Sequence, residues 1–167
     1  QELRASDSLL DDLQHEVWRI RTEYYQNQTT QYPNRAIVEI QLGWCLTGTK
    51  NWYEAIKHFE RIEANYCNLT TLEELALQLG LAESQQAIRR FDDALGTFIK
   101  LLELLTQCKR PDEVDEDLSA QIPGLENHSG MQRSLKRIKT LAASMNQAAL
   151  CQKCDDLAQK IVISTDN

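Results

Sequence analysis

The sequence predicts an all-α fold, and three observations predict it. Apolar residues recur at spacings of three and four through most of the 167 residues, which is the period of an amphipathic helix. The chain holds only six glycines and three prolines, too few for the frequent turns of a β-sandwich. Two helix-like stretches also match each other when one is shifted along the other. The length fits a single domain over residues 1–167.

The first predicted helix covers residues 6–29 and carries one apolar stripe. Ser6 or Asp7 is expected to be its N-cap, because a side-chain oxygen there accepts hydrogen bonds from the first turn. The polar stretch that follows ends at Pro33, so the helix is expected to end before it. The stripe consists of Leu9, Leu10, Leu13, Val17, Ile20 and Tyr24.

Four further helices are predicted in the middle of the chain. Their expected bounds are 34–47, 52–66, 71–88 and 91–108. Gly48 is expected to break the first of them. Thr70 or Thr71, with Glu73 or Glu74 three residues on, predicts a capping box at the start of the third.

An acidic loop is predicted over residues 109–130. It contains Pro111 and Pro123 and exceeds the usual ~12–15 residues of a structureless connection, so it is either mobile or folded over a neighbour. Residues 131–164 are predicted to be helical with a basic start, as one long helix or as a hairpin broken near Asn146. One interpretation folds the acidic run onto this basic start, although exposed ion pairs of that kind contribute only roughly 0–1 kcal/mol each.

The internal match appears at an offset of 39 positions. The matched pairs are Leu42 with Leu81, Gly43 with Ala82, Trp52 with Phe91, Ala55 with Ala94, and Phe59 with Phe98. The small residues are expected where two antiparallel helices come closest, and the aromatic residues beside the turn or in the next helix pair. Because one pair cannot bury its apolar face alone, neighbouring pairs are expected to stack.

These positions resemble the tetratricopeptide repeat, whose units hold a Leu-Gly pair, a turn aromatic, an alanine and a phenylalanine. The resemblance gives two units, at about 34–66 and 71–108. The chain departs from the family at Glu39 and Gln78, where an early aromatic residue is usual. The offset of 39 also exceeds the usual period of 34 residues.

The resemblance implies a right-handed superhelical stack of antiparallel helix pairs over residues 34–108. Repeat arrays need atypical ends, so capping helices are expected on both sides. The helix at 6–29 would cap the front, and residues 131–164 would cap the back as a C-terminal helix or a degenerate third unit. The alternative is an unrelated helical bundle.

In this family the first helix of each pair lines a concave groove, and the resemblance places the partner-binding residues there. The Lys, Arg and Asn side chains that grip a partner's C-terminal carboxylate in some members are apolar or acidic here, so that mode is not expected. An apolar groove around Trp44 suits a helix or an extended peptide of another protein. Alternatively, the chain fills its own groove and Trp44 is core. The candidate partner-binding residues are Ile37, Ile40, Gln41, Trp44, Thr47, Leu79, Glu83 and Gln86.

No catalytic, metal or cofactor site is predicted. Cys151 and Cys154 form a CxxC motif, but no second pair of ligands stands at zinc-like spacing. A redox motif would open a helix after a strand, so the two thiols are interpreted as packing residues. His58 is expected at the rim of its helix. Without a phosphate-binding loop or a HExxH motif, the chain is not expected to be an enzyme.

The amino-acid composition disfavours some classes of partner and some cellular locations. The chain carries 18 Lys and Arg against 25 Asp and Glu, which disfavours nucleic acid as a partner. No run approaches ~18 apolar residues, so no membrane insertion is expected. Five scattered cysteines indicate reduced thiols and a cytoplasmic protein, with a nuclear location left open.

Three functional hypotheses follow. The first is a non-catalytic interaction module, a scaffold or adaptor that recruits a partner protein through the concave groove without a cofactor. The second is a structural or oligomerising module with a self-filled groove, which would form a homodimer. The third is a small acidic chaperone built from the same repeats.

Overall fold

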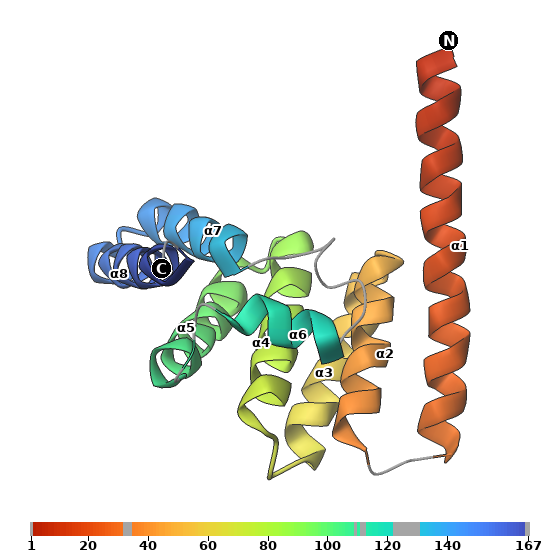
Figure 1. Ribbon diagram of the computed structural model, residues 1–167, viewed down its shortest axis with the longest axis horizontal. Coiled ribbons are helices and arrows are strands. Elements are labelled where there is room, and N and C mark those ends of the chain that lie inside the picture. Colours follow the sequence, from red (N-terminus) through yellow and green to blue (C-terminus); the bar gives the residue numbers. More distant parts are fainter. Residues whose placement is uncertain (1, 32–34, 109, 111–112, 122–130, 166–167) are drawn as a thin grey trace.

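The protein folds into eight α-helices in a computed structural model that describes residues 2–31, 35–108, 110, 113–121 and 131–165 (Figure 1). No β-strand occurs within these ranges, and the prediction of an all-α fold is confirmed. The helices are α1 (Glu2–Gln31), α2 (Ala36–Gly48), α3 (Trp52–Asn65), α4 (Thr71–Ala87), α5 (Phe91–Gln107), α6 (Val114–Gln121), α7 (Met131–Ser144) and α8 (Ala148–Thr165).

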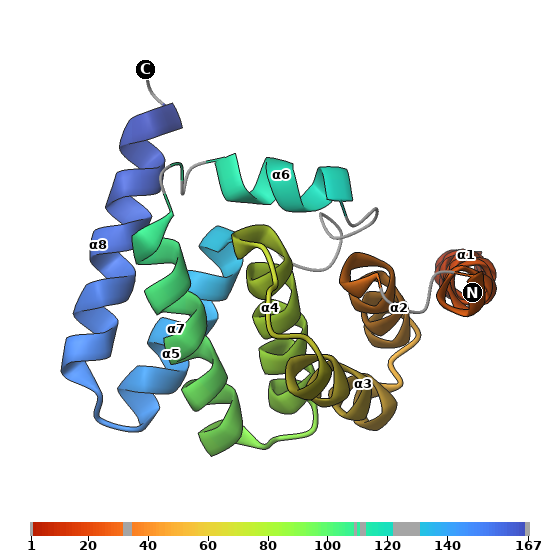
Figure 2. The ribbon, with the colours of Figure 1, turned by 90° about the horizontal axis from the view of Figure 1, so that it is seen from below.

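Helices that follow one another pack as antiparallel pairs. The pairs are α2 with α3, α4 with α5, and α7 with α8 (Figures 1 and 2). α4 also contacts α2 and α3, so it joins the first two pairs into one core. The bounds of α2 to α5 agree with the expected ones to within two residues. The question left open for residues 131–164 also has an answer, because the structure has two helices there.

The turns inside these three pairs have the same form. Lys50, Arg89 and Asn146 each adopt a left-handed conformation, with φ of 62°, 64° and 58°. In every case the next residue donates its amide to the carbonyl five residues earlier. These hydrogen bonds are Asn51 to Leu46 (2.9 Å), Arg90 to Gln85 (2.9 Å) and Gln147 to Ala142 (2.8 Å).

Phe59 is the point where α2, α3 and α4 meet. The side chain is fully buried, and a Cβ added at Gly43 or at Gly80 would lie 2.5 Å from its ring. Trp44 packs edge-on to the same ring at 6.4 Å, and its indole N–H donates to the Ala76 carbonyl at 3.1 Å. Two glycines on two helices therefore make room for one aromatic side chain.

The residues of the internal match are mostly buried, with two exceptions. Trp52 is half-buried, and Phe91 is 42% exposed rather than packed beside the turn. Phe91 opens α5 on the side that faces α7, and a groove separates it from that helix. The buried residues are Leu42, Gly43, Ala55, Phe59, Leu81, Ala82, Ala94 and Phe98.

A capping box starts α4, as predicted. The Thr70 hydroxyl accepts from the Glu73 amide at 3.2 Å, and the Glu73 carboxylate accepts from the Thr70 amide at 3.2 Å. Two amides without helical partners are satisfied at once, which fixes the first turn of the central helix.

The predicted acidic loop contains a helix. α6 lies across the first two helix pairs in Figure 2 and contacts α4, with Val114 and Leu118 buried. Arg110 pairs with Glu113 and with Asp117, the latter at 3.5 Å. The part of the prediction that falls on residues 122–130 lies outside the described residues.

The basic start of α7 does not receive that acidic run. Arg137 instead pairs with Glu83 of α4 at 2.9 Å, and Lys139 pairs with Asp155 of α8 at 2.8 Å. For the described residues, the interpretation that folded the acidic run onto the basic start is therefore wrong. These cations hold α7 to its helical neighbours.

α1 starts earlier than predicted and buries a different face. It begins at Glu2, so the N-cap prediction at Ser6 or Asp7 is wrong and both residues lie inside the helix. Its buried anchor is Trp18, which lies so close to Gly48 that a Cβ there would be 2.3 Å from the ring. The apolar stripe, expected to cover the array, is exposed along its whole length.

Candidate partner-binding surface

The eight predicted partner-binding residues do not form one surface. Ile40, Trp44, Thr47 and Leu79 are buried, with at most 4% of each residue exposed. The four that reach the surface, all half-buried, are Ile37, Gln41, Glu83 and Gln86. A partner that docks on this structure could therefore contact only the second group.

The buried group is explained by the central place of α4. That helix contacts α2, α3, α5 and α6, and residues 75–82 are buried without a break. A helix that is covered on all sides has no open face for a ligand. Trp44 of α2 is one of the side chains that bury α4, since its indole N–H donates to a backbone carbonyl of that helix.

A groove opens where α4 and α5 meet α7. It has a volume of about 540 Å³, within the range of ligand pockets. The exposed ring of Phe91 supplies most of its apolar surface, beside the buried Leu141 of α7 and the half-buried Met145 that follows that helix. The lining residues are Gln86, Phe91, Lys136, Arg137, Thr140, Leu141, Ser144 and Met145.

Two basic residues of α7 border the groove, and they differ in whether they form an ion pair. Arg137 is paired with Glu83, whose side chain is only 10% exposed, so this ion pair fixes α7 on α4. Lys136 is exposed and forms no ion pair with another residue of the described part of the chain. The groove therefore presents an apolar floor with one cation available at its edge.

A second hollow lies between α1 and α2, beside the start of α4. Its volume is about 530 Å³, and its lining is more polar than that of the groove. Two predicted residues, Ile37 and Gln41, belong to it. The complete lining is Tyr24, Tyr25, Gln28, Arg35, Ile37, Val38, Gln41, Thr70 and Glu73. It shares no residue with the groove.

The CxxC thiols are packing groups of α8. Cys154 is buried, and burial raises the pKa of its thiol to about 11. The Cys151 thiol is half-buried and donates to the Lys139 carbonyl at 3.6 Å. A thiol that keeps its proton is a poor nucleophile and a poor metal ligand. Within the described residues, no three His, Cys, Asp or Glu side chains cluster to hold a metal ion.

His58 is buried, so its expected place at the rim is wrong. The Glu39 carbonyl can only accept, so Nε2 donates to it at 2.7 Å. Arg61 can only donate, so Nδ1 accepts at 2.8 Å. The ring is therefore neutral and joins α3 to α2, and burial lowers its pKa.

Comparison with protein-family models, with curated proteins and with solved structures finds no match to this chain. Across the described residues, no helix is both long and apolar enough to cross a lipid bilayer. The function must therefore be argued from the surfaces themselves.

The groove contains residues that the sequence analysis did not select. Phe91 was expected to be buried, and the basic residues of α7 were considered only as partners for the acidic run. Leu141 is buried and Met145 half-buried, and their spacing of four does not show which apolar side chains line a groove. Only Gln86 was predicted to touch a partner and lies in the groove.

Proposed function

We propose that this protein is a non-catalytic interaction module of tetratricopeptide-like architecture, which binds a segment of a partner protein in the groove between Phe91 and α7. The observation that carries the proposal is the exposed ring of Phe91 in a groove that Leu141 and Met145 also line, next to an exposed lysine. Exposed aromatic side chains in concave sites are typical anchors of protein interfaces.

Two features support the finer architectural assignment. The turns at Lys50, Arg89 and Asn146 share one conformation and one hydrogen-bond pattern, as successive units of an array would. Phe59 fits between Gly43 and Gly80, so the first unit packs on the second through a residue of the internal match. On this account α7 and α8 are a degenerate third unit.

The chemistry of the groove defines its occupant. An apolar side chain would rest against Phe91 and Leu141, while a carboxylate beside it would reach Lys136. The partner segment is therefore a helix or an extended peptide with an acidic residue next to a large apolar one. No cofactor or metal takes part in this binding.

A random peptide library displayed on phage, followed by calorimetry of the selected peptides, tests the proposal. The selected peptides should combine an apolar anchor with Asp or Glu. Phe91→Ala should weaken their binding roughly tenfold or more, because buried aromatic anchors commonly contribute more than ~1.4 kcal/mol. Lys136→Glu should weaken it as well.

Tyr53→Ala is the matched control, since Tyr53 is an aromatic residue of α3 that is 62% exposed and lies outside the groove. Its affinities should equal those of the wild type. Equal binding by the wild type and Phe91→Ala, or selection of no peptide at all, would overturn the proposal.

A specific observation also favours part of the structural alternative. The inner residues Ile40, Trp44 and Leu79 are buried by the chain's own helices, as a self-filled groove requires. The two functions are compatible, because the groove at Phe91 involves other side chains. The peptide screen separates them, since a purely structural module would select nothing.

A further inference from the structure

α1 carries most of the large apolar side chains that the structure leaves exposed. Six of the nine such side chains among the described residues lie on this helix, each between 48% and 61% exposed. The six are the members of the predicted apolar stripe: Leu9, Leu10, Leu13, Val17, Ile20 and Tyr24. A monomer rarely exposes a contiguous patch of this kind unless something covers it.

Five of the six residues follow a heptad pattern. Leu10, Val17 and Tyr24 take the a positions, and Leu13 and Ile20 take the d positions. We call this set the α1 seam. Residues at the a and d positions form an apolar stripe that is narrower than the face a helix presents to a globular core. A stripe of this width suits contact with a single partner helix.

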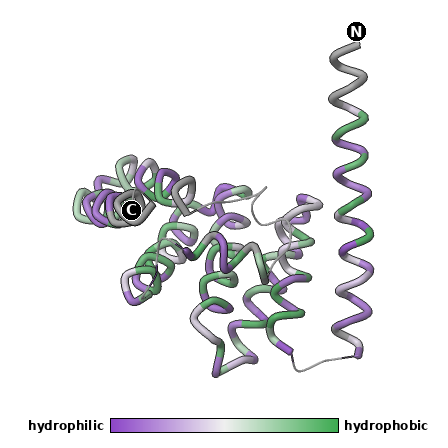
Figure 3. Tube along the Cα trace, viewed as in Figure 1, coloured by the Kyte–Doolittle hydropathy of each residue, from purple (hydrophilic) through white to green (hydrophobic). Residues whose placement is uncertain are grey.

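The seam is accessible in the fold. Residues 8–17 are all exposed, and this half of α1 projects beyond α2 without a neighbouring helix (Figures 1 and 3). Further along, α2 packs on the side of α1 that carries Trp18, and Tyr24 is the seam residue that also lines the hollow between these two helices. A second helix can therefore lie along the seam while α2 stays in place.

We propose that a second copy of this chain covers the α1 seam, so that two α1 helices form a parallel, in-register coiled coil. Each apolar side chain of the seam would then face the same residue of the other copy. The proposal goes beyond the peptide-binding function and does not depend on it.

One charged pair beside the seam, Glu16 and Arg21, favours a second copy in the parallel orientation. Glu16 occupies the g position and Arg21 the following e position, which meet between the copies of a parallel coiled coil. In the two antiparallel registers that overlap the seam most fully, Glu16 would instead face Glu16 or Glu23 of the other copy. Like charges in those places are unfavourable.

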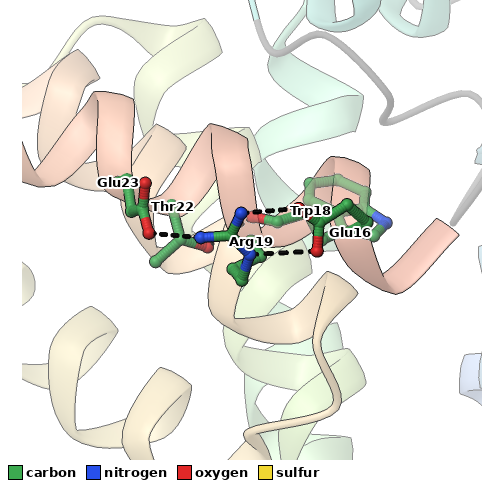
Figure 4. A network of polar contacts seen from close by, with 5 residues as sticks. All are labelled: Glu16, Trp18, Arg19, Thr22 and Glu23. Atoms are coloured by element: carbon green, nitrogen blue, oxygen red, sulfur yellow. Dashed lines mark hydrogen bonds and ion pairs between the residues drawn. The ribbon is translucent and has the colours of Figure 1, made fainter. Parts of the chain in front are cut away.

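Both charged side chains also make contacts within α1. Arg19 binds the Glu16 carboxylate at 3.0 Å through Nε and the Glu23 carboxylate at 2.5 Å through Nη1 (Figure 4). This hydrogen bond from Arg19 also lowers the pKa of Glu16, so the carboxylate is ionised. Arg21 stacks on the Trp18 ring at 5.0 Å, so its guanidinium lies on the side of α1 next to α2 in the single chain.

Sedimentation equilibrium of the chain over a wide concentration series tests the proposal. The expected mass rises from 19.2 kDa towards twice that value with increasing concentration. Leu13→Glu should raise the dissociation constant roughly tenfold or more, because it places an unpaired carboxylate in the seam. Circular dichroism should be unchanged, since Leu13 lies in the projecting half and contributes nothing to the core.

His15→Glu is the matched control, because it adds the same charge on the opposite, exposed face of α1. It should dimerise like the wild type. A chain that stays at 19.2 kDa throughout, or a dimer that Leu13→Glu leaves intact, would overturn the proposal.

Glu16→Gln tests the orientation. In the parallel dimer it removes two interchain ion pairs, so the dissociation constant should rise roughly two- to tenfold. In an antiparallel dimer it would remove a repulsion between carboxylates, so an unchanged or lower dissociation constant would overturn the parallel arrangement.

Discussion

At the scale of single residues, one buried ring organises the contact between the first two helix pairs. Phe59 of α3 fills the space that Gly43 and Gly80 leave on α2 and α4. Interiors are packed closely enough that a single methyl group in such a place is felt. The sequence analysis selected Phe59 and Gly43, but it gave Gly80 no structural role, because a glycine inside a helix shows its contact only once the helices are placed.

Gly80→Ala should destabilise the fold. The added Cβ would lie 2.5 Å from the Phe59 ring, so the helices must move apart or the ring must leave its rotamer. A loss of about 1–3 kcal/mol in the free energy of unfolding is expected, measured by urea denaturation. Gly96→Ala is the control, since a Cβ there would meet nothing within 4 Å apart from its own stretch of helix, and the variant should be neutral or stabilising. Equal stabilities of the two variants would contradict this packing.

His58 should make stability depend on pH in a defined window. Burial lowers its pKa in the folded state, whereas the unfolded imidazole titrates near ~6.5. The unfolded chain therefore binds a proton that the folded chain does not. The free energy of unfolding should fall as the pH drops from about 6.5 to the lowered pKa, and His58 should have no effect above that window.

Urea denaturation at several pH values, for the wild type and for His58→Gln, measures this contribution. The fall in stability below pH ~6.5 should be smaller in the variant, because glutamine does not titrate. His15→Gln, on the exposed face of α1, should behave as the wild type. The same pH dependence in the wild type and His58→Gln would show that the ring is not held neutral.

At the scale of elements, local rules predicted most helices and failed where a helix meets its neighbours. The bounds of α2 to α5 and the capping box at Thr70 follow from periodicity and end signals, which are properties of nearby residues. The buried face of α1 does not follow from these signals. The long, regular apolar stripe of α1 is exposed, and the side that carries Trp18 is buried instead. The single anchor Trp18 could be recognised only together with the space above Gly48.

In the candidate site, too, the features that depend on long-range packing were the ones that the sequence did not predict. The resemblance placed Trp44 and Leu79 in an open groove because it assigned helix faces by analogy. The structure surrounds α4 with four helices, a long-range arrangement that helical periodicity does not encode. Conversely, Phe91 matches Trp52 in the sequence, yet only the gap between α5 and α7 makes it a surface residue.

The three equivalent turns give a prediction about elements. Arg89 holds a left-handed conformation that costs a side chain roughly 1–2 kcal/mol, whereas glycine adopts it freely and loses up to ~1 kcal/mol in unfolded-state entropy. Arg89→Gly should therefore raise the melting temperature slightly in calorimetry. Asn146→Gly should give no gain, because asparagine tolerates this conformation. The opposite ranking would contradict the equivalence of the turns.

At the scale of the whole molecule, the helices leave two separate surfaces. The groove at Phe91 lies where the second helix pair meets the third, and the α1 seam projects from the opposite end of the molecule (Figure 1). A dimer joined through α1 would carry two grooves, so the whole assembly would bind a partner bivalently. Two linked sites gain affinity only when the partner spans both of them.

Hydrogen–deuterium exchange of the chain, with and without a peptide selected by the library, tests the central claim most directly. The binding of a partner segment in the groove should slow exchange over residues 134–144 of α7 and at the start of α5 near Phe91. α2 should be unaffected, because its predicted contact residues Ile40 and Trp44 are already in the core. Protection confined to α1 and α2, or no protection at all, would contradict the account.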